Sequence, residues 1–332
     1  MYLLTGATGF LGSHILLKLL QNGEQVRVVR RKSSSMHNLE KLFQKHDHHI
    51  LLAKVEWIEC DLLNPLDVKE AMNGITKVIH VAGFISFDPR DRQKLFDINM
   101  SGTANVVNAA LQAGVEKFLY VSSIAALGGA RDELMTEKNL WKNTPLNSNY
   151  GNSKYAGERE VWRGMEEGLD VLLVAPSVIL GYGDASKGGP TICRTVKNGI
   201  SYYPAGTNGF VGAEDVAKAI ILLMNSEKVN EKYILSAKNF SHQEILSIIA
   251  KEVGSKAPTK MAKPWMLSLA WRWEWLSCRL MKRKARITRE LANTMQVNMI
   301  YSGEKILEIE GFSYTPLPEC IREMAGLCKN EG

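Results

Sequence analysis

A glycine-rich turn near the start of the chain places the strongest constraint on the fold. It reads Thr5-Gly6-Ala7-Thr8-Gly9-Phe10-Leu11-Gly12, a G-x-x-G-x-x-G spacing that follows a short apolar run and precedes an apolar helical pattern. Glycine permits a tight turn and close approach of the backbone to a ligand, and the N-terminus of a helix attracts an anion. The order of strand, glycine turn and helix therefore predicts a site for the pyrophosphate of a dinucleotide.

The first half of the chain alternates strand-like and helical patterns. Runs rich in Val, Ile and Leu recur at Tyr2 to Leu4, Val26 to Val29, Val55 to Ile58, Val78 to Val81, Phe118 to Val121 and Val171 to Val174. Helical patterns lie between them, at Leu11 to Leu20, Leu66 to Met72, Gly102 to Ala113 and Tyr150 to Glu167. Strands that are almost continuously apolar fit burial on both faces, which predicts an α/β fold with a doubly wound parallel sheet.

The pattern changes after Pro176. A loop rich in small residues is followed by a helical pattern at Glu214 to Met224 and a strand-like run at Lys232 to Leu235. We therefore predict a Rossmann-type dinucleotide-binding domain over residues 1–176, with a return of the chain to it at about 210–236. Residues 177–209 and 237–332 are expected to form a smaller C-terminal domain that binds substrate.

Charge and hydropathy limit the possible partners. The net charge of +6 comes from one segment, since residues 251–290 hold eleven Lys or Arg against three Glu, so no nucleic-acid partner is expected. No apolar run nears the roughly 18 residues of a membrane span. A strand-like run begins at Tyr2, which leaves no room for a signal peptide, and we expect a cytoplasmic protein.

Cysteine and histidine patterns do not indicate a metal site. The five cysteines are odd in number and contain no Cys-x-x-Cys pair, so reduced structural thiols are expected. The tract Lys45-His46-Asp47-His48-His49 is interpreted as a solvated connection that lacks a helix to align its side chains as ligands.

Basic residues end the second predicted strand, in Val28-Val29-Arg30-Arg31-Lys32. A site selective for NAD usually has an acidic residue there, which binds the ribose hydroxyls. Guanidinium groups pair with a 2′-phosphate, so Arg30 and Arg31 favour NADP, and NAD stays possible if this is only a solvated loop. Asp61, after the third strand, is placed to accept from the adenine amino group.

Tyr150 and Lys154 are four residues apart in a helical pattern, so both side chains lie on one face. A free phenol has a pKa of about 10, and a nearby ammonium together with an oxidised nicotinamide would stabilise the phenolate as a usable acid or base. The pair Ser122-Ser123 ends the fifth strand and supplies a hydroxyl to the same region.

These motifs together resemble the extended short-chain dehydrogenase/reductases, also described as NAD-dependent epimerases/dehydratases. The resemblance runs from Met1 to about residue 235 and is greatest to the branch of dihydroflavonol reductases and 3β-hydroxysteroid dehydrogenases. It implies that Tyr150 is the acid/base, that Lys154 binds the ribose and tunes Tyr150, and that Ser123, in preference to Ser122, orients the reacting oxygen. The cofactor-binding residues that it implies are Gly6, Thr8, Gly9, Phe10, Leu11, Gly12, Arg30, Arg31, Asp61, Leu62, Val81, Ala82, Gly83, Asn99, Tyr150, Lys154, Pro176, Ser177 and Val178.

The predicted activity is an NADP(H)-preferring oxidoreduction of a carbonyl or secondary alcohol. Dehydration is disfavoured, because apolar Ala125 and Ala126 stand where dehydratases carry acidic residues. Epimerisation of a nucleotide sugar needs only transient oxidation and stays an alternative. A regulator that senses dinucleotides is ranked last, since such proteins often lose the Tyr or Lys that this chain retains.

Aromatic residues in loops beyond the strands suggest the substrate site. Phe84, Phe87, Tyr182 and Tyr203 are the candidates, and they favour a small apolar or ring-containing substrate unless they only pack on one another. The resemblance also implies a homodimer through helices near 103–113 and 150–167.

Residues 264–289 combine Trp265, Trp271, Trp273 and Trp275 with the basic run Lys282-Arg283-Lys284. We favour the interpretation of a lid over the substrate, with the tryptophans buried and the basic groups in water. A weak contact with an anionic membrane surface is the alternative.

Overall fold

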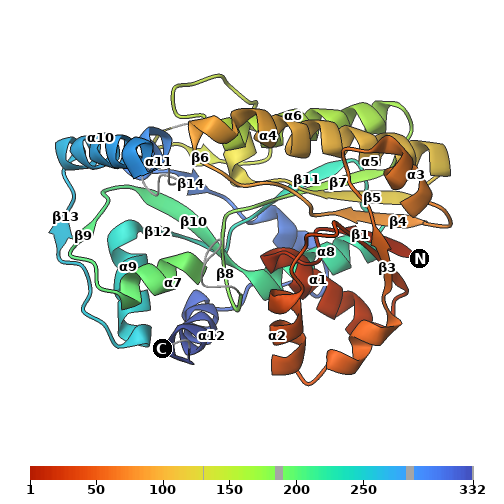
Figure 1. The fold of residues 1–332 in the computed structure, drawn as a ribbon, viewed down its shortest axis with the longest axis horizontal. Coiled ribbons are helices and arrows are strands. Elements are labelled where there is room, and N and C mark those ends of the chain that lie inside the picture. Colours follow the sequence, from red (N-terminus) through yellow and green to blue (C-terminus); the bar gives the residue numbers. More distant parts are fainter. Residues whose placement is uncertain (130, 184–189, 282–287, 331–332) are drawn as a thin grey trace.

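The computed structural model describes residues 1–129, 131–183, 190–281 and 288–330, and its centre is a seven-stranded parallel sheet (Figure 1). The strand order is β11-β7-β5-β4-β1-β2-β3. The chain adds β2 and β3 on one side of β1 and then adds β4, β5, β7 and β11 on the other side, so the direction reverses between β1 and β4. Sheets of this kind bind ligands at the carboxyl ends of the strands where the direction reverses. The strands are β1 (Tyr2–Thr5), β2 (Val26–Arg30), β3 (Glu56–Glu59), β4 (Lys77–His80), β5 (Lys117–Val121), β7 (Val171–Pro176) and β11 (Glu231–Leu235).

Helices cover both faces of this sheet (Figure 1). One face carries α1 (Phe10–Gln21), α2 (His37–Lys45) and α8 (Ala213–Asn225), and the other carries α3 (Pro65–Ala71), α5 (Gly102–Ala113) and α6 (Asn149–Glu166). Leu3 and Leu4 of β1 belong to the two different apolar clusters, as expected for a strand that is buried on both faces. The predicted α/β fold with a doubly wound parallel sheet is confirmed.

The sequence did not predict α2. Its Leu39, Leu42 and Phe43 are fully buried in the cluster beneath α1, which stabilises this nine-residue helix. Lys45 is its last residue, and His46, Asp47 and His48 follow it in a connection outside any helix. Among the residues that the structure describes, no group of three or more His, Cys, Asp or Glu is arranged to hold a metal ion.

Smaller sheets lie beyond β7. A three-stranded sheet in the order β12 (Lys238–Ser241), β10 (Thr207–Gly212) and β8 (Val178–Leu180) packs with α7 (Pro190–Lys197), α9 (His242–Val253) and α12 (Leu317–Asn330). Two strand pairs complete this region: β9 (Tyr202–Tyr203) with β13 (Lys260–Met261), and β6 (Leu134–Met135) with β14 (Ile300–Tyr301). The chain between β10 and β12 crosses back to the central sheet as α8 and β11. The domain division stays a prediction, and β10 spans its expected limit near residue 210.

The elements of this region and the remaining short helical turns complete the description of the chain. They are η1 (His49–Lys54), η2 (Pro89–Asp91), α4 (Arg92–Phe96), η3 (Asp97–Ser101), η4 (Ile124–Leu127), β6 (Leu134–Met135), β8 (Val178–Leu180), α7 (Pro190–Lys197), β9 (Tyr202–Tyr203), β10 (Thr207–Gly212), β12 (Lys238–Ser241), α9 (His242–Val253), β13 (Lys260–Met261), α10 (Pro264–Met281), α11 (Arg289–Thr294), β14 (Ile300–Tyr301), η5 (Lys305–Glu308) and α12 (Leu317–Asn330).

The tryptophan-rich segment forms α10, at the outer edge of the smaller lobe (Figure 1). Trp265, Trp273 and Trp275 each expose more than half of their surface, so the interpretation of a lid with buried tryptophans is wrong for these three. The basic run Lys282-Arg283-Lys284 lies outside the described residues. Within the described parts of the chain, no helix has the length and apolar character needed to cross a bilayer.

Candidate active site

The glycine turn between β1 and α1 is built so that only glycine fits at two of its positions. Gly6 has φ +74°, and a Cβ atom there would lie 2.7 Å from the Ala82 amide nitrogen. A Cβ atom on Gly12 would overlap the carbonyl oxygen of Gly6. Gly9 precedes α1 and no side chain caps the helix, so the backbone N–H groups of its first turn remain for an anion. The turn therefore fits the pyrophosphate of a dinucleotide.

A buried imidazole joins this turn to the loop after β4. Thr5 Oγ1 accepts hydrogen bonds from the Val81 and Ala82 amides, at 3.1 and 3.0 Å, so its own proton must go to His80 Nδ1, 2.7 Å away. A neutral imidazole then carries its proton on Nε2 and donates to Thr103 Oγ1 at 3.1 Å. Burial, with a smaller effect of Lys154, lowers the pKa of His80 to about 3 and keeps it neutral.

Thr103 connects His80 to Asn99 by hydrogen bonds. Asn99 is fully buried in η3, a single π-helical turn before α5. The Thr103 hydroxyl donates to the Asn99 carbonyl at 2.8 Å. The side-chain oxygen of Asn99, Oδ1, accepts from the Phe84 backbone amide at 2.7 Å. The side-chain nitrogen of Asn99, Nδ2, donates to the Phe84 carbonyl and to Ser153 Oγ, both at 2.9 Å. Asn99 thereby fixes the loop after Gly83 against the helix that carries Tyr150.

The phenol of Tyr150 lies beside Ser123. Burial raises the pKa of Tyr150 to about 12, and the hydrogen bond with the Ser123 hydroxyl opposes this shift. Ser123 also accepts from the Ala125 amide at 3.2 Å as the cap of η4. The Ser122 hydroxyl is buried without a partner among the described residues.

The Lys154 ammonium is held by β5, in the same buried region as the phenol. Its Nζ donates to the Val121 carbonyl at 2.8 Å and lies 4.2 Å from the centroid of the Tyr120 ring. Burial lowers the pKa of Lys154 to about 7, and the carboxylate of Glu158 opposes this shift. The effect expected of Lys154 on the pKa of Tyr150 also requires an oxidised nicotinamide, so it stays a prediction.

Near the end of β2, Arg30 lies at the edge expected for the adenosine of a dinucleotide. Its guanidinium is 5.9 Å from the centroid of the Trp57 ring. Neither Arg30 nor Arg31 forms an ion pair with a described residue. Asp61 accepts from the Leu63 amide at 3.0 Å, which is a turn contact, and the Leu62 carbonyl accepts from the Asn105 side chain. The roles of Asp61 and Leu62 toward adenine stay predictions.

The turn from Pro176 to Val178 joins the main sheet to β8. The amide and hydroxyl of Ser177 both donate to the Leu235 carbonyl, at 2.9 and 3.2 Å, which holds the turn to β11. Gly83 packs closely against Asn99. A Cβ atom on Gly83 would be 3.2 Å from Asn99 Oδ1.

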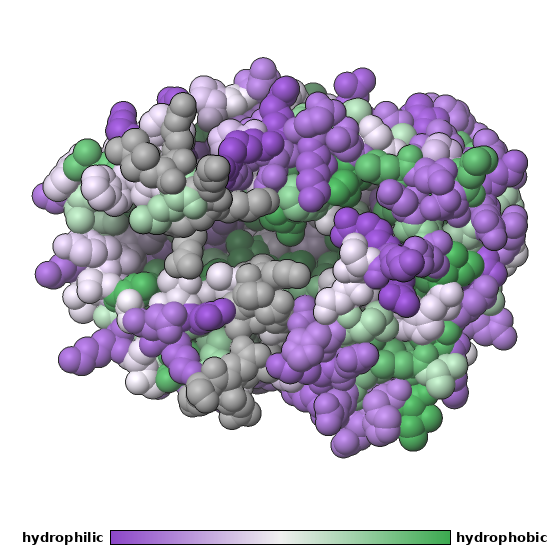
Figure 2. All heavy atoms as spheres, in the orientation of Figure 1, coloured by the Kyte–Doolittle hydropathy of each residue, from purple (hydrophilic) through white to green (hydrophobic). Residues whose placement is uncertain are grey.

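The four candidate aromatic residues for the substrate do not gather at one place. Phe87 lies edge-on to Tyr150, with ring centroids 6.0 Å apart, and Phe84 belongs to the same loop. Tyr182 instead lies against α1, since its carbonyl accepts from His14 and the Lys45 ammonium is 4.5 Å from its ring centroid. Tyr203 is in β9, paired with β13. Figure 2 shows a hollow near the centre of the molecule, with apolar residues on its floor.

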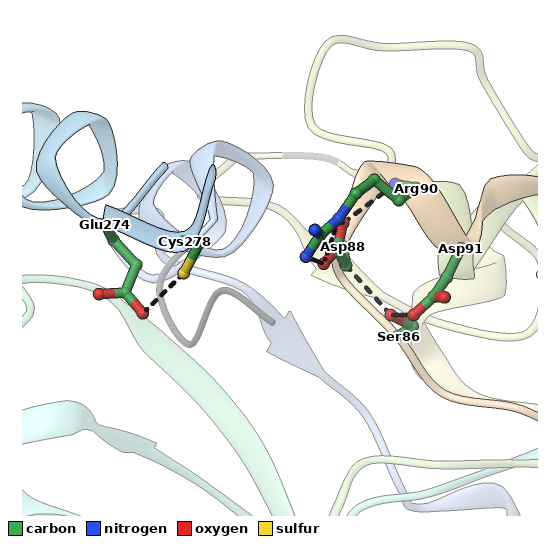
Figure 3. Close-up of polar contacts among 6 residues, drawn as sticks. All are labelled: Ser86, Asp88, Arg90, Asp91, Glu274 and Cys278. Carbon is green, nitrogen blue, oxygen red and sulfur yellow. Dashed lines mark hydrogen bonds and ion pairs between the residues drawn. The ribbon is translucent and has the colours of Figure 1, made fainter. Parts of the chain in front are cut away.

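The loop after β4 continues from Phe87 and lies opposite α10 (Figure 3). The Arg90 guanidinium forms a two-pronged ion pair with the buried Asp88 carboxylate, the shortest contact being 2.6 Å. Ser86 Oγ donates to Asp91 at 2.7 Å. In Figure 3 the Arg90 side chain extends toward α10, which carries Cys278.

Sequence reasoning missed Glu290, which links α11 to the helix of Tyr150. Its carboxylate accepts from the Asn149 amide at 3.3 Å and from the Asn149 side chain at 2.6 Å. Asn149 is the first residue of α6, so a carboxylate here also complements the positive end of the helix. No local pattern could reveal this contact, because the two residues are 141 positions apart.

The sheet, the glycine turn and the Tyr150–Lys154 pair define an NAD(P)-dependent enzyme of the extended short-chain dehydrogenase/reductase type. The model of the NAD-dependent epimerase/dehydratase family matches residues 2–236, and the chain belongs to this family.

Relatives of known name extend this assignment. The chain is 28% identical to a Synechocystis sp. protein named for dihydroflavonol 4-reductase, over all of this chain and 95% of that one. It is 30% identical to sterol demethylase protein B of Methylococcus capsulatus, over 79% of this chain and 77% of the relative. The solved structure of gox2253 is 28% identical and superposes with a TM-score of 0.81 over all of this chain and 98% of that one.

Proposed function

We propose that this oxidoreductase is an NADP(H)-preferring reductase of carbonyl groups, which also oxidises the corresponding secondary alcohols. The observation that carries the proposal is the buried phenol of Tyr150, which is hydrogen-bonded to the Ser123 hydroxyl and in edge contact with Phe87. Burial raises the pKa of Tyr150 to about 12, so the phenol holds its proton, and Lys154 together with an oxidised nicotinamide would lower this pKa toward the working pH. Proton donation is what a carbonyl oxygen requires as it becomes a hydroxyl.

The proposed mechanism assigns one task to each residue. A bound nicotinamide would supply the hydride. Ser123 donates a hydrogen bond to the carbonyl oxygen and positions it, and Tyr150 transfers its phenolic proton to the same oxygen. Lys154, held by the Val121 carbonyl, would bind the ribose and would place positive charge near the phenolate that remains.

The substrate is expected to be small and apolar or ring-containing. Phe87 covers one side of Tyr150, and Phe84 and the exposed Ile85 belong to the same loop. Tyr182 and Tyr203 are left out of the proposed pocket, because their contacts are with α1, α2 and β13.

NADP preference is proposed from Arg30 and Arg31. The end of β2 carries no carboxylate to accept from ribose hydroxyls, and neither guanidinium is paired with a described carboxylate. Both cations can therefore pair with a 2′-phosphate.

Calorimetric titration with NADPH and with NADH tests this part of the proposal. The unchanged protein should bind NADPH at least tenfold more tightly, and Arg30→Asp should lose this preference, since an Arg–phosphate pair contributes roughly 1.5–3 kcal/mol. Lys251→Asp, in α9, is the control for the change in net charge. Equal or tighter binding of NADH by the unchanged protein would favour epimerisation of a nucleotide sugar without added NADPH.

Reduction of a panel of apolar ketones and aldehydes tests the chemistry. Tyr150→Phe should lower kcat by about a hundredfold or more. Ser123→Ala should lower kcat strongly and Ser122→Ala only slightly, so the adjacent serines are matched variants. Equal losses from both serines, or full activity in Tyr150→Phe, would contradict the assigned roles.

We propose in addition a cytoplasmic homodimer that pairs through α5 and α6. Half-buried Leu111, Trp162 and Met165 on these helices support such a contact, and five free cysteines support a reducing compartment. Sedimentation velocity would detect the dimer, and a monomer at micromolar concentration would contradict it.

A further inference from the structure

The outer face of α10 is unusually apolar for a helix at the edge of a protein. Trp265, Leu269 and Trp273 follow one another at intervals of four residues, and they expose 60%, 58% and 74% of their surface. Arg272 lies among them and is also exposed, whereas Cys278 on the opposite side is buried. We call Trp265, Leu269, Arg272 and Trp273 the outer face of α10. Clustered exposed apolar side chains mark an interaction surface.

The apolar surface continues beyond the helix. Tyr202 and Met261, in the paired strands β9 and β13, expose 46% and 51% of their surface. Met261 precedes the start of α10 by three residues, and Figure 1 shows β13 next to the end of this helix. The two strands thus extend the same edge of the lobe.

Cations surround this edge and carboxylates are nearly absent from it. Lys256, Lys260 and Lys263 are exposed, and neither they nor Arg272 form an ion pair with any residue that the structure describes. Residues 255–281 contain a single carboxylate, Glu274, which accepts from Cys278 on the inner side of the helix. The edge is therefore both apolar and positively charged.

We propose that the outer face of α10 docks on the surface of an anionic lipid bilayer. The tryptophans enter the boundary between headgroups and acyl chains, where large rings with a polar N–H are favoured. Arg272 and the three lysines lie against the lipid phosphates. The helix lies in the plane of the surface and does not cross it, so the binding is reversible.

A lipid surface fits this edge better than a second copy of the chain. A symmetric dimer through the outer face would bring Arg272 and its neighbouring lysines against the same residues of the other copy. Like charges facing each other oppose association, whereas an anionic bilayer attracts all four.

The location of α10 gives the docking a role. Figure 3 shows the part of α10 that carries Glu274 and Cys278 across from the loop of Asp88 and Arg90, which directly follows Phe87. Docking would bring this loop, and with it Phe87 beside Tyr150, close to the bilayer, where an apolar substrate collects. This role rests on the proposed function, but the docking itself does not depend on it.

Sedimentation with vesicles tests the docking in the full-length protein. We expect binding to vesicles of phosphatidylcholine mixed with phosphatidylglycerol, a blue shift of tryptophan emission, and weakening by salt. Vesicles of phosphatidylcholine alone should bind far less, by about fivefold for each cation at the surface. Trp265→Ser with Trp273→Ser should weaken binding by about tenfold for each ring.

Leu66→Ser with Leu140→Ser is the matched control, because these side chains are 74% and 83% exposed and lie outside the proposed surface. It should bind vesicles as the unchanged protein does, and both double variants should retain the melting temperature and NADPH affinity. Absence of vesicle binding, or equal binding by the tryptophan variant, would overturn the proposal. A concentration-dependent dimer that the tryptophan variant alone loses, without vesicle binding, would identify a second copy as the occupant.

Discussion

The buried imidazole of His80 should make the protein less stable as the pH falls, and His80→Phe should remove that dependence. In the folded protein the pKa of His80 is lowered from 6.5 to about 3, first by burial and then by Lys154. The unfolded chain takes up a proton below pH 6.5, and the folded chain does not. The stability that the neutral ring contributes is therefore complete above pH 6.5 and is lost as the pH falls toward 3.

The size of the effect follows from this shift. A pH of 5 lies about 1.5 units below the pKa of histidine in the unfolded chain. Protonation of the unfolded state therefore lowers the free energy of unfolding by about 2 kcal/mol. At pH 8 the variant should be less stable than the unchanged protein by about 2 kcal/mol, because Thr5 and Thr103 each lose a buried hydrogen-bond partner. At pH 5 this difference should almost vanish.

Urea denaturation of both proteins at pH 8, 6.5 and 5 measures these free energies. Comparison of the two proteins cancels the contribution of His14, whose pKa is also lowered by burial, to about 4. A stability difference that stays constant from pH 8 to pH 5 would show that His80 is not the neutral, proton-ordered ring inferred from its contacts. The variant should also bind NADPH more weakly, since Thr5 then orients the Val81 and Ala82 amides less firmly.

Three further predictions concern single positions. Gly12→Ala should weaken NADPH binding at least tenfold by calorimetry, because its Cβ would displace the Gly6 carbonyl; unchanged affinity would show that the turn is more pliable than its geometry indicates. Glu290→Ala should lower kcat by about tenfold through loss of the contact with Asn149, with Glu290→Gln less affected; steady-state kinetics equal to the unchanged protein would exclude a positioning role. Lys117→Met should lower the free energy of unfolding in urea by about 2 kcal/mol, because the buried ammonium binds two carbonyls at the end of α8; a loss below about 0.5 kcal/mol would contradict this.

Much of the central fold was predictable because its signals are local. The seven strands of the central sheet lie within one or two residues of the predicted runs, since the inner strands are apolar on both faces, whereas the edge strand β3 is only half-buried. The glycine turn was also predictable, because close backbone packing at Gly6 and Gly12 admits no other residue. In contrast, α2 escaped prediction, because its buried Leu39, Leu42 and Phe43 are surrounded by a polar sequence.

The proton-donating residues illustrate the limit of sequence reasoning at the site. The spacing of Tyr150 and Lys154 sets them on one face of a helix, but it does not determine their pKa values. Burial raises the pKa of Tyr150 to about 12, and the Lys154 ammonium donates to the Val121 carbonyl. Those contacts join β5 to α6, and no local pattern specifies them.

The sequence by itself determined the parallel sheet, the dinucleotide turn and the family, because periodicity and glycine spacing act within a few residues. Tertiary structure alone decided which side chains surround the phenol, how His80 is protonated, and that Trp265, Trp273 and Trp275 of α10 face solvent. These outcomes depend on burial and on contacts between distant segments. A helix carries the same sequence whichever face it buries, and only its packing partners decide which face remains exposed.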